Sequence, residues 1–126
     1  MRTKLKVVEV RDPGKRNERV FMQALQDVDL GDYIVTDTTY RQNGAVSNKA
    51  RHVYEFARKI VKAGEYIALH SEVGTYKVDK TSDSGTPLHR FYWGLNYTIW
   101  NKDGDTAWLL YAPLAERQAK PVAVAK

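Results

Sequence analysis

Apolar side chains recur at every second position in short runs along the chain, which is the period of a β-strand rather than of a helix. In the second of these runs, Val20, Met22 and Ala24 share one face. Phe21 and Leu25 fall on the opposite face. Turn-forming residues separate the runs. The pattern predicts strands at residues 5–10, 19–25, 33–38, 52–56, 65–70, 97–100 and 106–111.

Short strands at this spacing, about seven to nine in all, are typical of an all-β antiparallel sandwich or barrel. Residues 51–62 can be written at helical spacing, but their β-branched and aromatic side chains favour strand, turn and strand. One helical turn is predicted at residues 114–120. The segment 112–126 is expected to form an edge or a tail, with a short edge strand at 122–125 after Pro121.

The segment FYWGLNYTIWNKDGDTAWLLYAP, residues 91–113, concentrates aromatic side chains around Asp103-Gly104. An Asp-Gly pair between two strand-like runs predicts a tight hairpin, since both residues accept positive φ. Trp100 and Trp108 each lie four residues from Gly104. We therefore expect them to form a cross-strand aromatic pair inside the core, with Leu110 extending the same face inward.

Two longer polar stretches interrupt the alternation, at residues 40–51 and 77–87. The first contains Asn43-Gly44, a turn-forming pair. The second is rich in Ser, Thr, Asp and Gly, and a mobile loop is predicted there.

Composition bounds the class of protein. The chain has 126 residues, 43% of them hydrophobic and 28% charged, as expected of one globular domain spanning residues 1–126. It has no cysteine, which excludes disulfides and thiol catalysis. No run approaches the roughly 20 apolar residues of a membrane span, and the first residues lack a signal-peptide pattern. We expect a cytoplasmic protein if the chain is full-length and possible export if it is an excised domain.

Three motifs in order carry a resemblance to a known family: VDLGDYIVTD at 28–37, HVYEFARKIVKAGEYIALH at 52–70 and YWGLNYTIWNKDGDTAWL at 92–109. From Arg19 to Leu110, the chain resembles a lamin tail domain. In the first motif, Gly31-Asp32-Tyr33 replaces the family's usual Ser-Gly-Trp, and after Tyr111 the family's usual turn into a last strand is missing.

The resemblance implies an immunoglobulin-like sandwich with a non-catalytic role and no cofactor. Lamin tails bind other proteins and have been linked to DNA and chromatin, and bacterial relatives often sit beside nucleases, hydrolases or export signals. The expected function is an interaction or anchoring module that binds a protein or surface partner, or a second copy, through its polar loops or a sheet edge.

Direct nucleic-acid binding is the alternative, because the formal net charge is +5. Basic and aromatic side chains in and beside the two polar stretches would contact phosphates and stack on bases if both stretches lie at one end of the sandwich. The opposing interpretation is a solvated loop end, with Trp93 packed in the core. The candidate binding residues are Arg41, Lys49, Arg51, Lys77, Lys80, His89, Arg90 and Tyr92.

A metal-assisted hydrolase is a remote further alternative. Residues 101–105, Asn-Lys-Asp-Gly-Asp, resemble the start of a calcium loop, but Ala112 stands where a closing Glu is needed. His52, His70 and His89 lack zinc-ligand spacing and are expected at the surface or at strand edges. Ser71, His70 and Asp37 supply the residue types of a catalytic triad, without a Gly-x-Ser-x-Gly motif. No metal ligands or catalytic residues are therefore predicted.

Overall fold

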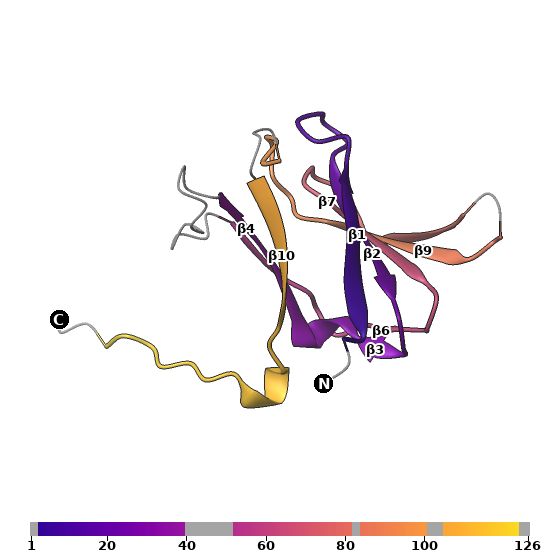
Figure 1. Ribbon diagram of the computed structural model, residues 1–126. Coiled ribbons are helices and arrows are strands. Elements are labelled where there is room, and N and C mark those ends of the chain that lie inside the picture. Colours follow the sequence, from indigo (N-terminus) through magenta and orange to yellow (C-terminus); the bar gives the residue numbers. More distant parts are fainter. Residues whose placement is uncertain (1–2, 40–51, 82–83, 101–104, 124–126) are drawn as a thin grey trace.

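The computed structural model describes residues 3–39, 52–81, 84–100 and 105–123 (Figure 1). Within them the fold is all-β, as predicted, and no helix there is long and apolar enough to cross a membrane. Two 3₁₀ turns are present, η1 (Leu30–Asp32) and η2 (Leu114–Glu116). The strands are β1 (Leu5–Arg11), β2 (Arg19–Ala24), β3 (Val28–Asp29), β4 (Tyr33–Thr39), β5 (Val53–Glu55), β6 (Ile60–Val61), β7 (Tyr66–His70), β8 (Lys77–Lys80), β9 (Pro87–Tyr92) and β10 (Asp105–Tyr111).

The strands form a sheet of five in the order β1-β2-β7-β9-β8, a sheet of three in the order β10-β4-β5, and the short pair β3-β6. Neighbouring strands are antiparallel except β7 and β9, which run parallel. In Figure 1 the three-stranded sheet lies on the left and the five-stranded sheet on the right. Because the chain crosses over between β7 and β9, β8 occupies the outer edge of the larger sheet.

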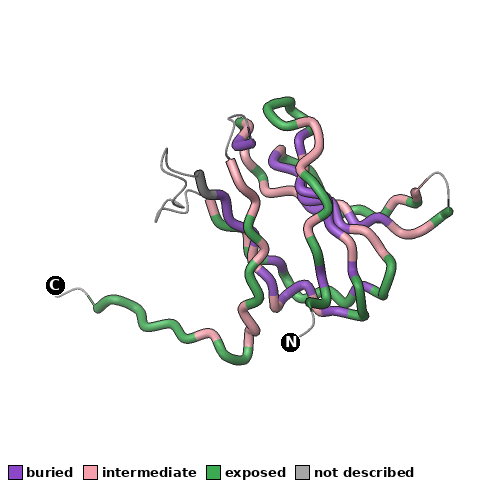
Figure 2. The backbone as a smooth tube through the Cα atoms, viewed as in Figure 1, coloured by how far each residue is buried: buried purple, intermediate pink, exposed green. Residues whose placement is uncertain are grey.

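The main core lies between the two larger sheets. Val20, Met22 and Ala24 of β2 face it, as the alternation predicts, and Leu69 of β7 faces it from the next strand. Val35 of β4 faces it from the three-stranded sheet. Buried positions therefore concentrate along the inner faces, while residues 118–123 extend away from the sheets and are mostly exposed (Figure 2).

The outer face of the five-stranded sheet carries a second, smaller cluster. Phe21, Ala68 and Leu88 are buried there, and Tyr66 stacks on Phe21 with ring centroids 5.2 Å apart. The guanidinium carbon of Arg11 lies 3.7 Å from the centroid of the Phe21 ring. Long side chains thus cover an apolar centre on a face that would otherwise meet water.

A buried carboxylate holds the loops at one end of the sandwich. Glu18 precedes β2 and is fully buried. Its Oε1 accepts the N–H of Gly14 at 2.9 Å, and its Oε2 accepts the hydroxyl of Ser71 at 2.6 Å and the N–H of Ile99 at 2.8 Å. The N–H of Trp100 also points at both oxygens, at 3.3 Å. One side chain therefore joins the β1–β2 loop, the end of β7 and the segment before β10.

The predicted tryptophan pair does not form. Residues 97–100 make no strand, since two of their N–H groups point at Glu18, and β10 pairs with β4 instead. Trp100 is buried, but Trp108 is 36% exposed and Leu110 43% exposed. In the β4 register, Leu109 lies opposite the buried Val35, so Trp108 and Leu110, on either side of Leu109, face outward. The Asp103-Gly104 turn lies outside the described residues.

Of the other sequence predictions, some are confirmed and some are wrong. Residues 77–87 were predicted to be a mobile loop, but β8 forms there and pairs with β9, and backbone hydrogen bonds of Thr81 with Gly85 and Thr86 continue the pairing beyond β8. The interpretation of residues 51–62 as strand, turn and strand is confirmed by β5 and β6, and η2 falls within the predicted helical turn. Residues 121–123 form no strand, and 124–126 lie outside the described residues.

We predict that Glu18→Gln destabilises the protein by about 2–4 kcal/mol, because the new amide N–H₂ faces N–H and O–H donors and leaves buried groups unsatisfied. Urea unfolding followed by circular dichroism measures this change. Glu116→Gln, at an exposed position in η2, is the matched control and is expected to change stability by less than about 0.5 kcal/mol. Equal midpoints for the two variants would contradict the role given to Glu18.

Candidate functional site

The candidate nucleic-acid-binding residues do not all share a surface. Arg41, Lys49 and Arg51 lie outside the described residues. Lys77, Arg90 and Tyr92 alternate onto the outer face of the five-stranded sheet, the face that carries Leu88. His89 and Lys80 alternate to the opposite side, the side of Phe91. That the polar stretches at residues 40–51 and 77–87 lie at the same end of the sandwich stays a prediction.

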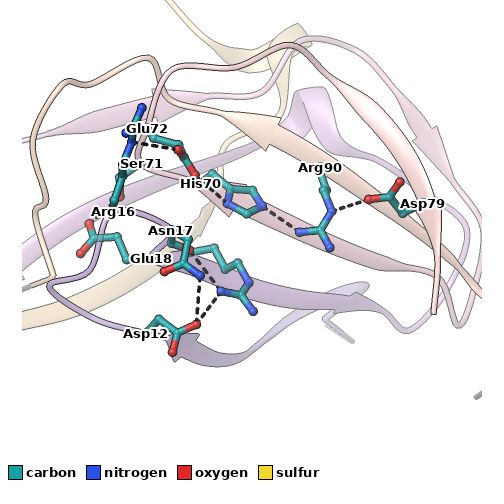
Figure 3. A network of polar contacts seen from close by, with 10 residues as sticks. Asp12, Arg16, Asn17, Glu18, His70, Ser71, Glu72, Asp79 and Arg90 are labelled. Atoms are coloured by element: carbon teal, nitrogen blue, oxygen red, sulfur yellow. Dashed lines mark hydrogen bonds and ion pairs between the residues drawn. The ribbon is translucent and has the colours of Figure 1, made fainter. Parts of the chain in front are cut away.

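On the outer face, polar side chains form a continuous chain of contacts from the β1–β2 loop to β8 (Figure 3). Arg16 Nε lies 3.7 Å from Glu72 Oε1, and Glu72 Oε2 lies 3.8 Å from His70 Nδ1. Arg90 donates to His70 Nε2 at 2.9 Å and to Asp79 at 2.6 Å. The network thus alternates cations and carboxylates around one imidazole.

His70 is held neutral at the centre of this network. Because arginine only donates, His70 Nε2 must accept, and the ring proton is on Nδ1, which has no hydrogen-bond partner among the described residues. Burial, together with the nearby charges of Arg90, Arg19 and Lys77, lowers the pKa of His70 to about 4. The prediction of a surface histidine is wrong here, since the sheet itself buries this side chain.

The cations around His70 are largely neutralised by partners. Arg19 pairs with Asp12 at 2.9 Å, as Arg90 does with Asp79, whereas Lys77 makes no ion pair within the described part of the chain. Tyr92 stacks on His70 with ring centroids 4.9 Å apart. It also packs so closely on Gly74 that a Cβ there would lie 2.3 Å from the Tyr92 ring. Tyr92 is therefore engaged by its neighbours rather than presented as an open stacking platform.

His89 belongs to a separate relay. Its Nε2 lies 2.9 Å from Glu65 Oε1 and its Nδ1 lies 2.9 Å from the Tyr76 hydroxyl. Burial acts to raise the pKa of Glu65, but the N–H of Lys62 and the imidazole of His89 outweigh it and lower that pKa. His89 is buried, so the surface prediction is wrong for it too. Both of its ring nitrogens are occupied.

A groove of about 440 Å³ lies at the end of the sandwich that Glu18 organises. It runs between the β1–β2 loop, the segment after β7 and the segment before β10. Sequence reasoning missed it, because residues 97–100 read as a strand and nothing in their alternation indicates a concave surface. The residues that line the groove are Arg16, Glu72, Val73, Leu95, Asn96, Tyr97 and Thr98.

A second carboxylate–imidazole–phenol relay reaches this groove. The buried Asp37 of β4 accepts the backbone N–H of His52 at 2.7 Å through Oδ1 and lies 2.9 Å from His52 Nδ1 through Oδ2. His52 Nε2 lies 3.1 Å from the hydroxyl of Tyr97, which lines the groove. Trp93 is partly buried against the core, as one interpretation expected, and meets the His52 ring edge-on.

The outward face of the three-stranded sheet presents an apolar surface. Trp108 lies opposite Thr36, which lies opposite Val53, and Val53 is 53% exposed. In the next row, Leu110 lies opposite Ile34. We call this surface, formed by Trp108, Leu110, Ile34 and Val53, the Trp108 face. The four side chains come from all three strands, and such a group of partly exposed apolar residues is typical of a docking surface.

The described residues contain no group of three or more His, Asp or Glu able to hold a metal ion. Of the calcium-loop residues, only Asp105 is described, at the start of β10. The other residues of that segment, Asn101 to Gly104, lie outside the description.

Comparison with known proteins assigns no family. No family model matches this chain, and no curated protein matches it.

The depressed pKa of His70 predicts acid sensitivity. Unfolding returns the imidazole to its ordinary pKa of 6.5, so the unfolded state binds more protons and stability falls as the pH drops from about 6.5 toward 4. The expected loss from this one group is roughly 3 kcal/mol, fully present only at the acid end. His70→Gln is expected to be less acid-sensitive over that window than the native chain, as measured by urea unfolding at each pH.

A substitution that merely weakens packing would lower stability equally at all pH values. The informative quantity is therefore a difference in the free energy of unfolding between the native chain and His70→Gln. Its value at pH 4.5 is subtracted from its value at pH 8. If this difference is zero, the imidazole is not held neutral by its surroundings.

Proposed function

We propose that the chain is a non-catalytic interaction module of lamin-tail type that binds an extended segment of a partner protein against the three-stranded sheet. The observation that carries this proposal is the Trp108 face, which places the partly exposed Trp108 and Leu110 on the same outward face as the exposed Val53, with β4 between them. Large aromatic side chains in partly exposed positions supply most of the binding energy at protein interfaces.

The edge of the sheet supports an extended partner. β5 is the outer strand beyond β4 and pairs with no other described strand, so its second edge offers backbone donors and acceptors. A strand added there would continue the Trp108 face from Val53. At the end of β5, Glu55 is held by Arg117 at 3.1 Å. The segment that fits has alternating apolar residues, which would continue the Trp108 face.

The arrangement of the family motifs supports the lamin-tail part of the proposal. The motif at 28–37 forms β3, η1 and most of β4, and the motif at 52–70 forms β5, β6 and β7. The third motif, at 92–109, begins at the end of β9 and runs into β10. Each motif therefore contributes strands that bound the main core.

The test is selection of random peptides displayed on phage against the folded chain. We expect enriched peptides with alternating apolar residues, and we expect their affinity to fall at least about tenfold on Trp108→Glu, since an interface aromatic is worth about 2 kcal/mol or more. Isothermal titration with synthetic peptides measures the change. Because Trp108 lies outside the core, the variant is expected to lose no more than about 1 kcal/mol of stability.

The control is Val122→Glu, which adds the same charge at a position 87% exposed in the C-terminal segment. Peptides should bind this variant as they bind the native chain. N-methylation of alternate peptide amides should abolish binding if a strand is added to β5. Peptides that bind Trp108→Glu unchanged, or the enrichment of none with the alternating pattern, would overturn the proposal. Concentration-dependent sedimentation reversed by Trp108→Glu would identify a second copy as the partner.

Nucleic-acid binding is the second candidate, and one observation favours it. Lys77, on the outer face of the five-stranded sheet, has no ion-pair partner among the described residues, whereas Arg19 and Arg90 on the same face are paired with carboxylates. Lys77 is the residue of this group that a phosphate reaches without breaking an ion pair of the described chain. The outer face would then contact the phosphate backbone without reading sequence.

Titration of a short duplex at several salt concentrations tests this second candidate. If Lys77 contacts a phosphate, Lys77→Ala should reduce the slope of log K against log salt by about 1. Lys120→Ala, in the exposed C-terminal segment, serves as the charge-matched control and should leave the slope unchanged. An affinity that does not vary with salt would remove nucleic acid as a partner.

A further inference from the structure

We propose that Tyr97 is a covalent modification site, whose phenol takes an acyl group from an activated ester or thioester bound in the adjoining groove, with His52 as the general base. This inference is independent of the Trp108 face and of the partner proposed for it. It rests on the geometry of Asp37, His52 and Tyr97 and on the position of Tyr97 in the lining of the groove.

The proton positions in the relay follow from its partners. An ionised carboxylate only accepts, so His52 Nδ1 carries the proton that is donated to Asp37 at 2.9 Å. His52 Nε2 is then the acceptor for the Tyr97 hydroxyl at 3.1 Å. Asp37 also holds the backbone N–H of His52, so it fixes both the ring tautomer and the position of the residue. A nucleophile, a base and an orienting carboxylate in this order constitute an activated nucleophile.

The groove supplies the binding site that the relay needs. Val73 and Leu95 give it an apolar lining, which suits a short aliphatic acyl chain. Asn96 and Arg16 line the same groove and carry N–H donors of the kind that stabilise an oxyanion. The end of the groove near Arg16 also contains Glu72, with which Arg16 pairs.

The chemical step balances without any further reagent. The Tyr97 oxygen attacks the carbonyl carbon of the bound ester, and the phenolic proton passes to His52 Nε2. The tetrahedral intermediate collapses by breaking the bond to the leaving group. The leaving alcohol or thiol takes the proton from the imidazolium, which regenerates neutral His52 and leaves an aryl ester on Tyr97.

The other relay, which contains His89, helps to assign the reactivity. Glu65, His89 and Tyr76 repeat the carboxylate, imidazole and phenol order, but Tyr76 does not line this groove. Its ring packs on Phe91 with centroids 4.9 Å apart, and the Lys59 ammonium lies 5.5 Å from its centroid. Reactivity that needs both the base and the groove is therefore assigned to Tyr97.

The experiment treats the purified chain with p-nitrophenyl butyrate and maps the modified tyrosines over time by mass spectrometry. Tyr97 and Tyr111 are 54% and 52% exposed, so Tyr111 is the internal reference for a phenol of equal access without an imidazole partner. We expect Tyr97 to be acylated at least about tenfold faster than Tyr111, because general-base assistance contributes factors of this size or larger. His52→Gln should bring the two rates together.

One further measurement keeps the proposal falsifiable if His52→Gln unfolds. In the native chain, the ratio of the Tyr97 rate to the Tyr76 rate should rise from the acetyl to the butyryl ester, because the groove binds the longer acyl group. Equal labelling of Tyr97 and Tyr111, or faster labelling of Tyr76, would overturn the proposal.

Discussion

The Glu18 carboxylate is the constraint on which one end of this sandwich depends. A buried anion is costly unless donors surround it, and here the donors come from Gly14, Ser71, Ile99 and Trp100. Those donors belong to three separate segments, so satisfying one charge fixes the relative positions of three loops. The groove lies among the same segments, and its shape is therefore a by-product of the way the charge is satisfied.

The main features of the fold could be predicted from alternation alone, because a period of two leaves little freedom once one face is buried. The faces of β2 were predicted correctly for this reason. Alternation cannot show which strands pair, however. Trp108 sits on the outward face because β10 takes its register from β4. No local sequence pattern indicates that register. The same is true of the hydrogen bonds from Ile99 and Trp100 to a carboxylate some eighty positions earlier in the chain.

The candidate sites were less accessible to sequence reasoning than the fold, since each combines residues far apart in the chain. The histidines illustrate this limit. His52, His70 and His89 look alike in sequence, yet His52 and His89 face carboxylates through Nδ1 and Nε2 respectively, whereas His70 accepts from a guanidinium through Nε2. Likewise, the sequence does not show whether a lysine or tyrosine side chain is free to contact a ligand. Tyr92, for example, packs on Gly74.

The parallel pairing of β7 and β9 has a consequence for the order of assembly. β8 and β9 are antiparallel and close together in sequence, so they can pair locally, whereas β7 and β9 can meet only after the crossover closes. The β8–β9 pair would dock onto β7 as a preformed unit, and its docking would also bring Tyr92 onto His70. Because β8 and β9 would join the larger sheet late in folding, we expect local unfolding of the native chain to begin at these two strands.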